Sequence, residues 1–244
     1  MAEAGFSALI RLLTGRSYPN VTLGEVKYLA QKGGFEWFRG FAWSLFHLRS
    51  PRGLMLGSGI KFILADRLRL GRGVSLGRGC YLDCSAERGV TLGNRVTIRE
   101  YGWLQCRSGL NDKAGEVRIG ERVYIGPFAV IGAGGDVIIG PGCQIGARFT
   151  LSAESHQPGE DGSYVKGRVQ RKGISIGRDC WIGNNVCILD GVRVGDRCTL
   201  GAGSVVTRNV PDGATAYGVP ARSVIQGGTK DEIRSGVNDK DIDE

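Results

Sequence analysis

Histidine, methionine and long apolar runs are scarce in this chain of 244 residues. It holds two histidines and two methionines. Two histidines cannot complete a zinc centre that needs three of them. No apolar run approaches the roughly 20 residues of a membrane-spanning helix, and the N-terminus lacks the basic-then-apolar pattern of a secretion signal. We therefore expect no such zinc centre, no membrane span and a cytoplasmic protein.

Nucleic-acid-binding motifs are also missing, although the chain is basic. It has 32 Lys and Arg against 24 Asp and Glu, a net charge of +8. The basic residues are spread along the chain, and no helix-turn-helix, zinc-finger or ribonucleoprotein motif accompanies them. The charge balance favours an anionic ligand or surface, and we expect no nucleic-acid partner.

What the chain does have is a six-residue period. From Leu70 onward, an aliphatic residue followed by glycine recurs in steps of six, with insertions after Leu82, Leu104, Ile131 and Leu151. A hexapeptide period indicates a parallel β-helix, in which three hexapeptides close one triangular turn of about 18 residues. The pairs are Leu70-Gly71, Leu76-Gly77, Leu92-Gly93, Ile119-Gly120, Ile125-Gly126, Ile131-Gly132, Ile139-Gly140, Ile145-Gly146, Ile176-Gly177, Ile182-Gly183, Val194-Gly195 and Leu200-Gly201.

A smaller residue follows many of these aliphatic residues by four positions. Positions two or four apart share one face of a strand, so each hexapeptide has a large and a small inward position. The glycine suits the corner between them, which explains why glycine, with 41 residues, exceeds its usual share of about 7%. The small inward positions are Val74, Cys80, Val96, Val123, Ala129, Cys143, Cys180, Val186, Val192, Cys198 and Ser204.

Four of the seven cysteines fall on these inward positions, and no C-x-x-C pair occurs. Buried cysteine behaves as a small hydrophobic residue. We therefore predict structural, reduced thiols, which are typical of cytoplasmic proteins.

The period divides the chain into three parts. Residues 1–55 do not follow it and predict short helices separated by turns, including one at Gly33-Gly34, that cap the coil or pack against another subunit. Residues 56–226 predict the β-helix, with a loop extruded over 152–175. Residues 227–244 predict a mobile polar tail. Aromatic residues in 35–48 lie beside basic ones, so peripheral contact with the inner membrane face is an alternative for this segment.

His156 is the candidate for chemistry, because it opens the longest extruded loop. A neutral imidazole accepts a proton readily near neutral pH. Glu154 lies two residues earlier, so in extended chain both side chains point the same way. The carboxylate could then hold the second ring nitrogen and orient the base. The alternative is a lone surface histidine on a loop.

The segments 174–192, 201–207 and 217–222 carry W-I-G, G-A-G-S-V-V-T and G-V-P-A-R. In this order they resemble the hexapeptide-repeat acyltransferases over roughly residues 70–226. The resemblance is greatest to galactoside and maltose acetyltransferases and to the sugar O-acetyltransferases of exopolysaccharide and O-antigen pathways. It implies an all-β fold, a left-handed parallel β-helix with a short helical N-terminal segment. It also implies a homotrimer that binds acetyl-CoA between neighbouring subunits.

The resemblance also implies roles for individual residues. His156 would be the general base, assisted by Glu154, and no metal would be needed because a thioester is already activated. The cofactor-binding residues would be Trp181 in the groove wall, Asn184 and Ala202 along the pantetheine, and Thr207 and Arg222 at the CoA end. A second basic residue of the family is replaced by Ile225, so Arg208 would take over the adenosine-phosphate contact. Glu100 and Gln105 are candidates for the acceptor.

The expected reaction is transfer of acetyl from acetyl-CoA to a sugar hydroxyl in surface polysaccharide biosynthesis, with a saccharide acceptor that includes lipid-linked glycans. An amino-sugar N-acetyltransferase stays open, because the same base would serve an amine. A structural β-helix scaffold is the non-enzymatic alternative. Two histidines exclude a γ-type carbonic anhydrase, which needs three around its zinc. Residues 1–55 are too short for the leading domain of a β-helix nucleotidyltransferase. A serine acetyltransferase is a closer rival, but it carries a larger helical N-terminus.

Overall fold

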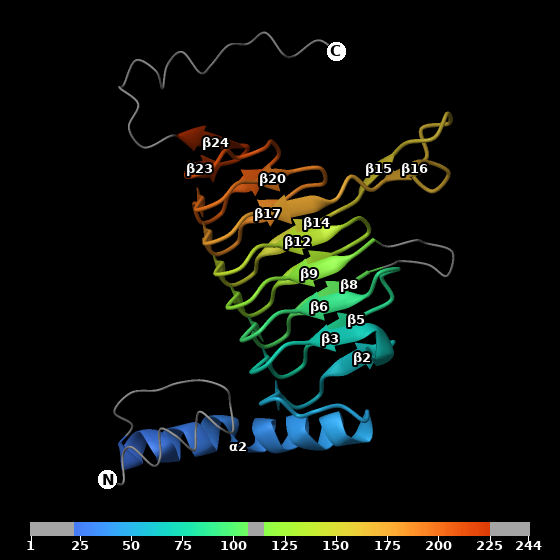
Figure 1. The fold of residues 1–244 in the computed structure, drawn as a ribbon. Coiled ribbons are helices and arrows are strands. Elements are labelled where there is room, and N and C mark those ends of the chain that lie inside the picture. Colours follow the sequence, from blue (N-terminus) through green and yellow to red (C-terminus); the bar gives the residue numbers. More distant parts are fainter. Residues whose placement is uncertain (1–21, 107–114, 225–244) are drawn as a thin grey trace.

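The computed structural model describes residues 22–106 and 115–224. The predicted tail 227–244, Ile225 and the predicted turns within residues 1–21 lie outside these ranges. The described part is a stack of triangular coils with one helix, α2 (Leu23–Phe46), lying across its N-terminal end (Figure 1). Within the described ranges no helix is long and apolar enough to cross a membrane.

Three parallel sheets form the sides of the coil, and each successive coil adds one strand to each sheet. Sheet A contains β1 (Met55–Leu56), β4 (Ser75–Leu76), β7 (Thr97–Ile98), β10 (Tyr124–Ile125), β13 (Gln144–Ile145), β18 (Trp181–Ile182), β21 (Thr199–Leu200), β23 (Thr215–Gly218) and β24 (Ala221–Val224). The last pair, β23 and β24, is antiparallel and ends the sheet.

Sheets B and C complete each coil in turn. Sheet B contains β2 (Lys61–Ile63), β5 (Tyr81–Asp83), β8 (Trp103–Gln105), β11 (Val130–Gly132), β14 (Thr150–Ser152), β19 (Cys187–Ile188) and β22 (Val205–Val206). The 3-10 turn η1 (Ala65–Arg67) leads into sheet C, which contains β3 (Leu68–Leu70), β6 (Val90–Leu92), β9 (Val117–Ile119), β12 (Val137–Ile139), β17 (Ile174–Ile176) and β20 (Arg193–Val194).

The core follows the predicted inward positions. Every predicted small position is buried, and so is every aliphatic residue of the predicted pairs except Leu70, which is half-buried. The inward cysteines also satisfy corner carbonyls: Cys143 Sγ donates to Gly177 O (3.0 Å), and Cys180 Sγ donates to Gly195 O (3.1 Å). All seven cysteines are free thiols, as expected for structural residues.

The glycine after each aliphatic residue is required by contact between coils. At Gly126 a Cβ would lie 2.6 Å from the backbone nitrogen of Ala147 on the next coil. The positive backbone angle of the corner lies two residues later, at Phe128 (φ 60°). Glycine therefore allows adjacent corners to approach, while Phe128, two residues later, makes the left-handed turn.

Helix α2 is continuous, and the predicted turn at Gly33-Gly34 is wrong. The helix begins with a capping box in which Glu25 N donates to Thr22 Oγ1 and Thr22 N donates to Glu25 Oε2. The C-terminal part of the helix packs against the coil at Gly40. The contact is so close that a Cβ there would lie 2.0 Å from Leu54 O. The N-terminal capping box and the packed C-terminal part lie on either side of the two adjacent glycines and offset their low helix propensity.

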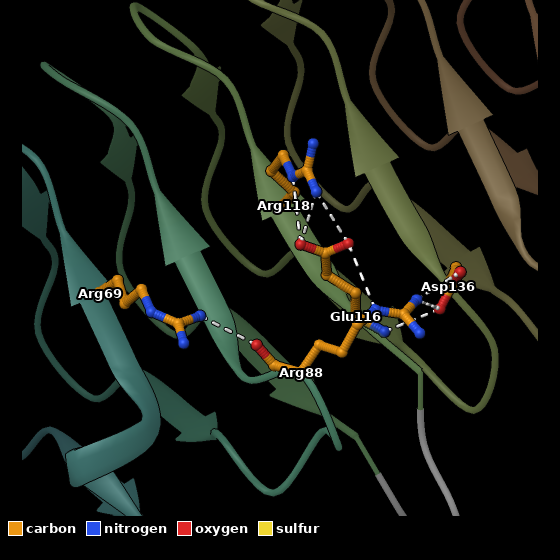
Figure 2. Close-up of polar contacts among 5 residues, drawn as sticks. All are labelled: Arg69, Arg88, Glu116, Arg118 and Asp136. Carbon is orange, nitrogen blue, oxygen red and sulfur yellow. Dashed lines mark hydrogen bonds and ion pairs between the residues drawn. The ribbon is translucent and has the colours of Figure 1, made fainter.

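Ion pairs tie neighbouring coils together on the outer side of sheet C (Figure 2). Arg88 Nη2 donates to both carboxylate oxygens of Asp136 (2.7 and 2.8 Å). Asp136 Oδ1 also accepts from Glu116 N (2.8 Å), and Glu116 pairs with Arg118 (2.8 Å). The exposed pairs contribute about 0–1 kcal/mol each, so their main effect is to fix the chain just before β9.

Candidate functional site

A β-hairpin projects from the coil between sheets B and C (Figure 1). Its strands β15 (Ser155–Gln157) and β16 (Arg168–Gln170) pair antiparallel, with His156 opposite Val169. The coil closes around the insertion, because β14 still pairs with β19 and β12 with β17. The hairpin is thus an ordered extension of a rigid scaffold.

His156 lies in the middle of β15 and is exposed. Its side chain has no hydrogen bond or ion pair with the residues in 22–106 and 115–224. An imidazole held on a paired strand yet open to solvent is free to accept a proton from a substrate.

Glu154 does not orient this imidazole in the structure. Its Oε2 lies 3.4 Å from Nε of Arg171, and both side chains are about three-quarters buried, with 21% and 26% exposed. Glu154 is also packed tightly against Gly134, where a Cβ would lie 2.1 Å from Oε2. The expected contact is not formed because a cation and a glycine-lined cavity hold the carboxylate on the coil, before the chain enters β15.

A small pocket of about 150 Å³ lies beside Glu154, where β8, β11 and β14 end. Its polar members are Glu154 and Gln105, and its wall includes Trp103. Trp103 Nε1 donates to Gln105 Oε1 (3.1 Å), and the indole stacks on Tyr81 at 4.1 Å between ring centroids. An aromatic wall beside a carboxylate and an amide is an arrangement suited to a polyhydroxylated ligand.

Glu100 lies away from this pocket. It occupies the corner between sheets A and B and accepts two hydrogen bonds, each 2.9 Å, from its neighbour Arg99. Of the two candidate acceptor residues, the structure brings only Gln105 together with Glu154.

The residues expected to bind CoA fall into two groups, and the first lies on or beside the corner between sheets A and B. Trp181 on β18 is 54% exposed. Asn184 follows it at the corner, and its Oδ1 accepts from Ala147 N (2.8 Å). Ala202 takes the same corner one coil later, where a Cβ on Gly183 would lie 2.6 Å from its nitrogen.

Thr207 and Arg208 lie elsewhere. Both are exposed and follow β22 at the corner between sheets B and C, the same corner from which the His156 hairpin leaves. Arg222 is exposed on the terminal strand β24, where its guanidinium donates to Ala221 O (3.3 Å). Within one protomer, therefore, His156 lies at one edge of sheet B. The groove candidates Trp181, Asn184 and Ala202 lie at or beyond the other edge.

Two residues of this region are absent from the expectations above. Trp103 alternates with Gln105 along β8, so their shared face could have been read from the sequence. Arg171 lies 17 residues after Glu154, and its contact depends on how the hairpin closes, which no local pattern reports. In the described part of the chain no cluster of His, Cys, Asp and Glu could hold a metal ion.

Residues 173–208 match the family Bacterial transferase hexapeptide (six repeats). The chain is 34% identical to galactoside O-acetyltransferase of Escherichia coli K12 over 129 residues, which are 53% of this chain and 63% of that protein. It is 27% identical to a probable acetyltransferase of Mycobacterium tuberculosis over 224 residues, 88% of this chain and 66% of that protein. The chain thus spans less than two thirds of the length of these relatives.

A solved structure shares the fold. It is a mutant of AntD, an N-acyltransferase from Bacillus cereus, in complex with dTDP and coenzyme A, and it is 19% identical with a TM-score of 0.52. The alignment covers 73% of this chain and 89% of that one. The predicted fold class and the predicted resemblance are confirmed: the chain is an all-β, left-handed parallel β-helix similar to the hexapeptide-repeat acyltransferases.

Proposed function

We propose that this protein is an acetyl-CoA-dependent O-acetyltransferase that acts on a sugar hydroxyl, with His156 as general base. The observation that carries the proposal is the exposed imidazole, without a side-chain partner among the described residues, on a hairpin anchored at both ends in the coil. The relatives support the class of reaction, since galactoside O-acetyltransferase is similar over 129 residues. Surface polysaccharide biosynthesis is the setting that we propose for it.

The transfer would proceed in one displacement. His156 takes the proton of the acceptor hydroxyl as its oxygen bonds to the thioester carbonyl carbon. The tetrahedral oxyanion then collapses, the carbon–sulfur bond breaks, and CoA leaves as a thiolate that recovers the proton from the imidazolium. General base catalysis of this kind contributes about 10²–10⁴ in rate.

The site is proposed to be shared between protomers of a homotrimer. Its support is the separation of the two corners by sheet B: the A–B corner of one protomer would face the B–C hairpin of its neighbour. Trp181, Asn184 and Ala202 would then line the pantetheine arm, with Thr207, Arg208 and Arg222 toward the phosphates. Arginine side chains suit that end because they bind phosphate oxygens strongly.

The pocket beside the hairpin is the proposed place for part of the acceptor. Gln105 and Glu154 would bind sugar hydroxyls there, and Trp103 would contact the apolar face of the ring. Glu154 could orient His156 only if its ion pair with Arg171 broke. We therefore assign Glu154 mainly to binding the acceptor, and only secondarily to orienting the base. Glu100 remains a candidate only for a substrate that reaches the A–B corner.

The experiment is a thiol-release assay with acetyl-CoA across a panel of sugars, amino sugars and lipid-linked glycans. We expect O-acetylation of a saccharide and a loss of about 10²–10⁴ in kcat for His156→Ala, with unchanged thermal stability because the side chain is exposed. Gln157→Ala, next to it on β15, is the matched control. Full activity of His156→Ala would refute the role. Acetylation of amines alone would favour the amino-sugar N-acetyltransferase, and inactivity with every acceptor would favour a scaffold.

The compartment is proposed to be the cytoplasm. The support is chemical: all seven cysteines are free, and six of them are buried as structural thiols. Reduced cysteines of this kind persist in reducing compartments.

A further inference from the structure

Helix α2 carries an apolar stripe that faces away from the coil. Phe35, Phe38, Leu45 and Phe46 are 77%, 63%, 54% and 85% exposed. Their spacing, with exposed Ala42 between them, places them on one side of a helix of 3.6 residues per turn. An exposed stripe dominated by phenylalanine is unusual on a soluble surface and marks an interaction site.

The opposite side of the helix is fully used in holding the coil. Gly40 and Ser44 are buried, and Arg39 Nε donates to Leu56 O (2.8 Å). The Trp43 ring lies 5.1 Å from Phe62 and stacks on His47 at 4.1 Å. The helix therefore lies flat across the N-terminal end of the stack (Figure 1). Its exposed stripe is on the side that does not contact the coil.

The apolar stripe itself carries no charged side chain, and basic side chains lie at its two ends. Between residues 35 and 46 the charged side chains are Glu36 and Arg39, and both are half-buried on the coil side of the helix. Basic side chains flank the stripe: Lys27 is exposed near the helix start, and Arg52 is exposed just after its end. The whole chain carries a net charge of +8. An apolar stripe bordered by cations complements an anionic lipid surface, where phenylalanine enters the interface and basic side chains meet headgroups.

We propose that α2 is a peripheral membrane-docking helix that places this end of the β-helix on an anionic lipid surface. Phe35, Phe38, Leu45 and Phe46 enter the interfacial layer, and Lys27 and Arg52 contact the headgroups. The coil-side contacts stay in place, so docking requires no unfolding. The inference stands apart from the proposed catalysis, because α2 lies at the end of the stack away from the His156 hairpin.

The test is flotation of the full chain with phosphatidylcholine vesicles, with and without phosphatidylglycerol. We expect the protein to float with the anionic vesicles and to detach as salt is raised, since screening weakens the headgroup contacts. Replacing Phe35, Phe38 and Phe46 together by serine removes most of the buried apolar area on docking. Binding should then fall at least about tenfold.

The control replaces Tyr101 and Phe128 by serine, a stacked pair of aromatic residues on the coil that are 42% and 51% exposed. This variant should float like the unchanged protein. Circular dichroism should stay unchanged in both variants, and acetyl transfer to a water-soluble acceptor should stay unchanged in the triple variant. Failure of the unchanged protein to float, or equal flotation of the triple variant, would overturn the proposal. So would a loss of molar mass in the triple variant, because the stripe would then cover a second copy of the chain.

Discussion

At the scale of single residues, the glycines of the repeat show how close the coils are. A Cβ on Gly126 or Gly140 would lie 2.6 Å from backbone atoms of the next coil. That is far inside van der Waals contact, and backbone cannot move aside as a side chain can. At Gly132, which also follows an aliphatic residue, the nearest atom would be 3.5 Å away.

We therefore expect Gly126→Ala to destabilise the fold by about 1–3 kcal/mol, because overpacking displaces the corner. Gly132→Ala should change the free energy of unfolding by less than about 0.5 kcal/mol. Urea denaturation of the two variants measures the difference. Equal effects would show that the corner glycines are not set by contact between coils.

The buried thiols predict that the free energy of unfolding falls at alkaline pH. Burial raises the pKa of the Cys84 thiol to about 12, with further contributions from Cys106 and Asp83. The unfolded chain, with a cysteine pKa near 8.5, releases this proton first, so the folded state binds more protons between the two values. Stability is therefore fully present below about pH 8.5 and falls as pH rises toward 12, by at most about 1.4 kcal/mol per pH unit.

Urea denaturation at pH 8 and pH 10 tests this expectation on the unchanged protein and Cys84→Ala. The variant should lose less stability between the two pH values, because alanine has no proton to release. An identical loss in both proteins would contradict the assignment.

At the scale of elements, the coil holds the fold together without the hairpin, and the hairpin carries the proposed base. The parallel pairs β12–β17 and β14–β19 close the coil without help from β15 or β16. Ser155 and Gln170 face each other at the hairpin base, so a short linker could join the chain there. The stability of the stack thus lies in its coils, and the proposed chemistry lies on an appended strand.

Replacing residues 156–169 by a short glycine-serine turn should leave the melting temperature within a few degrees of the original, while acetyl transfer disappears. Differential scanning calorimetry and the thiol-release assay give the two readouts. A variant that retained transfer would place the base outside the hairpin.

At the scale of the whole molecule, the decisive feature is the distance between two corners. Asn184 and Ala202 take the A–B corner, while His156 leaves from the B–C corner, and sheet B lies between them. A protomer arranged in this way presents the two proposed half-sites on different sides, and the proposed cyclic assembly would bring them together.

Subunit mixing tests the shared site. His156→Ala removes the base, and Ala202→Tyr blocks the groove without touching the base, so each should be inactive alone. Co-refolding equal amounts should restore about a quarter of the original activity, because one site in four then combines an intact base with an intact groove. Each variant refolded alone is the control, and no recovery in the mixture would place the whole site within one protomer.

The sequence by itself determined the coil, its inward positions and the place of the extruded loop, because a period of six residues reports burial locally and an interrupted period reports an insertion. The structure added that this loop contains a β-hairpin. Only the tertiary structure decided how Glu154 meets Arg171, how α2 continues through Gly33 and Gly34, and which candidate residues lie on which corner. These depend on contacts between residues far apart in the chain, where packing and charge outweigh any local preference.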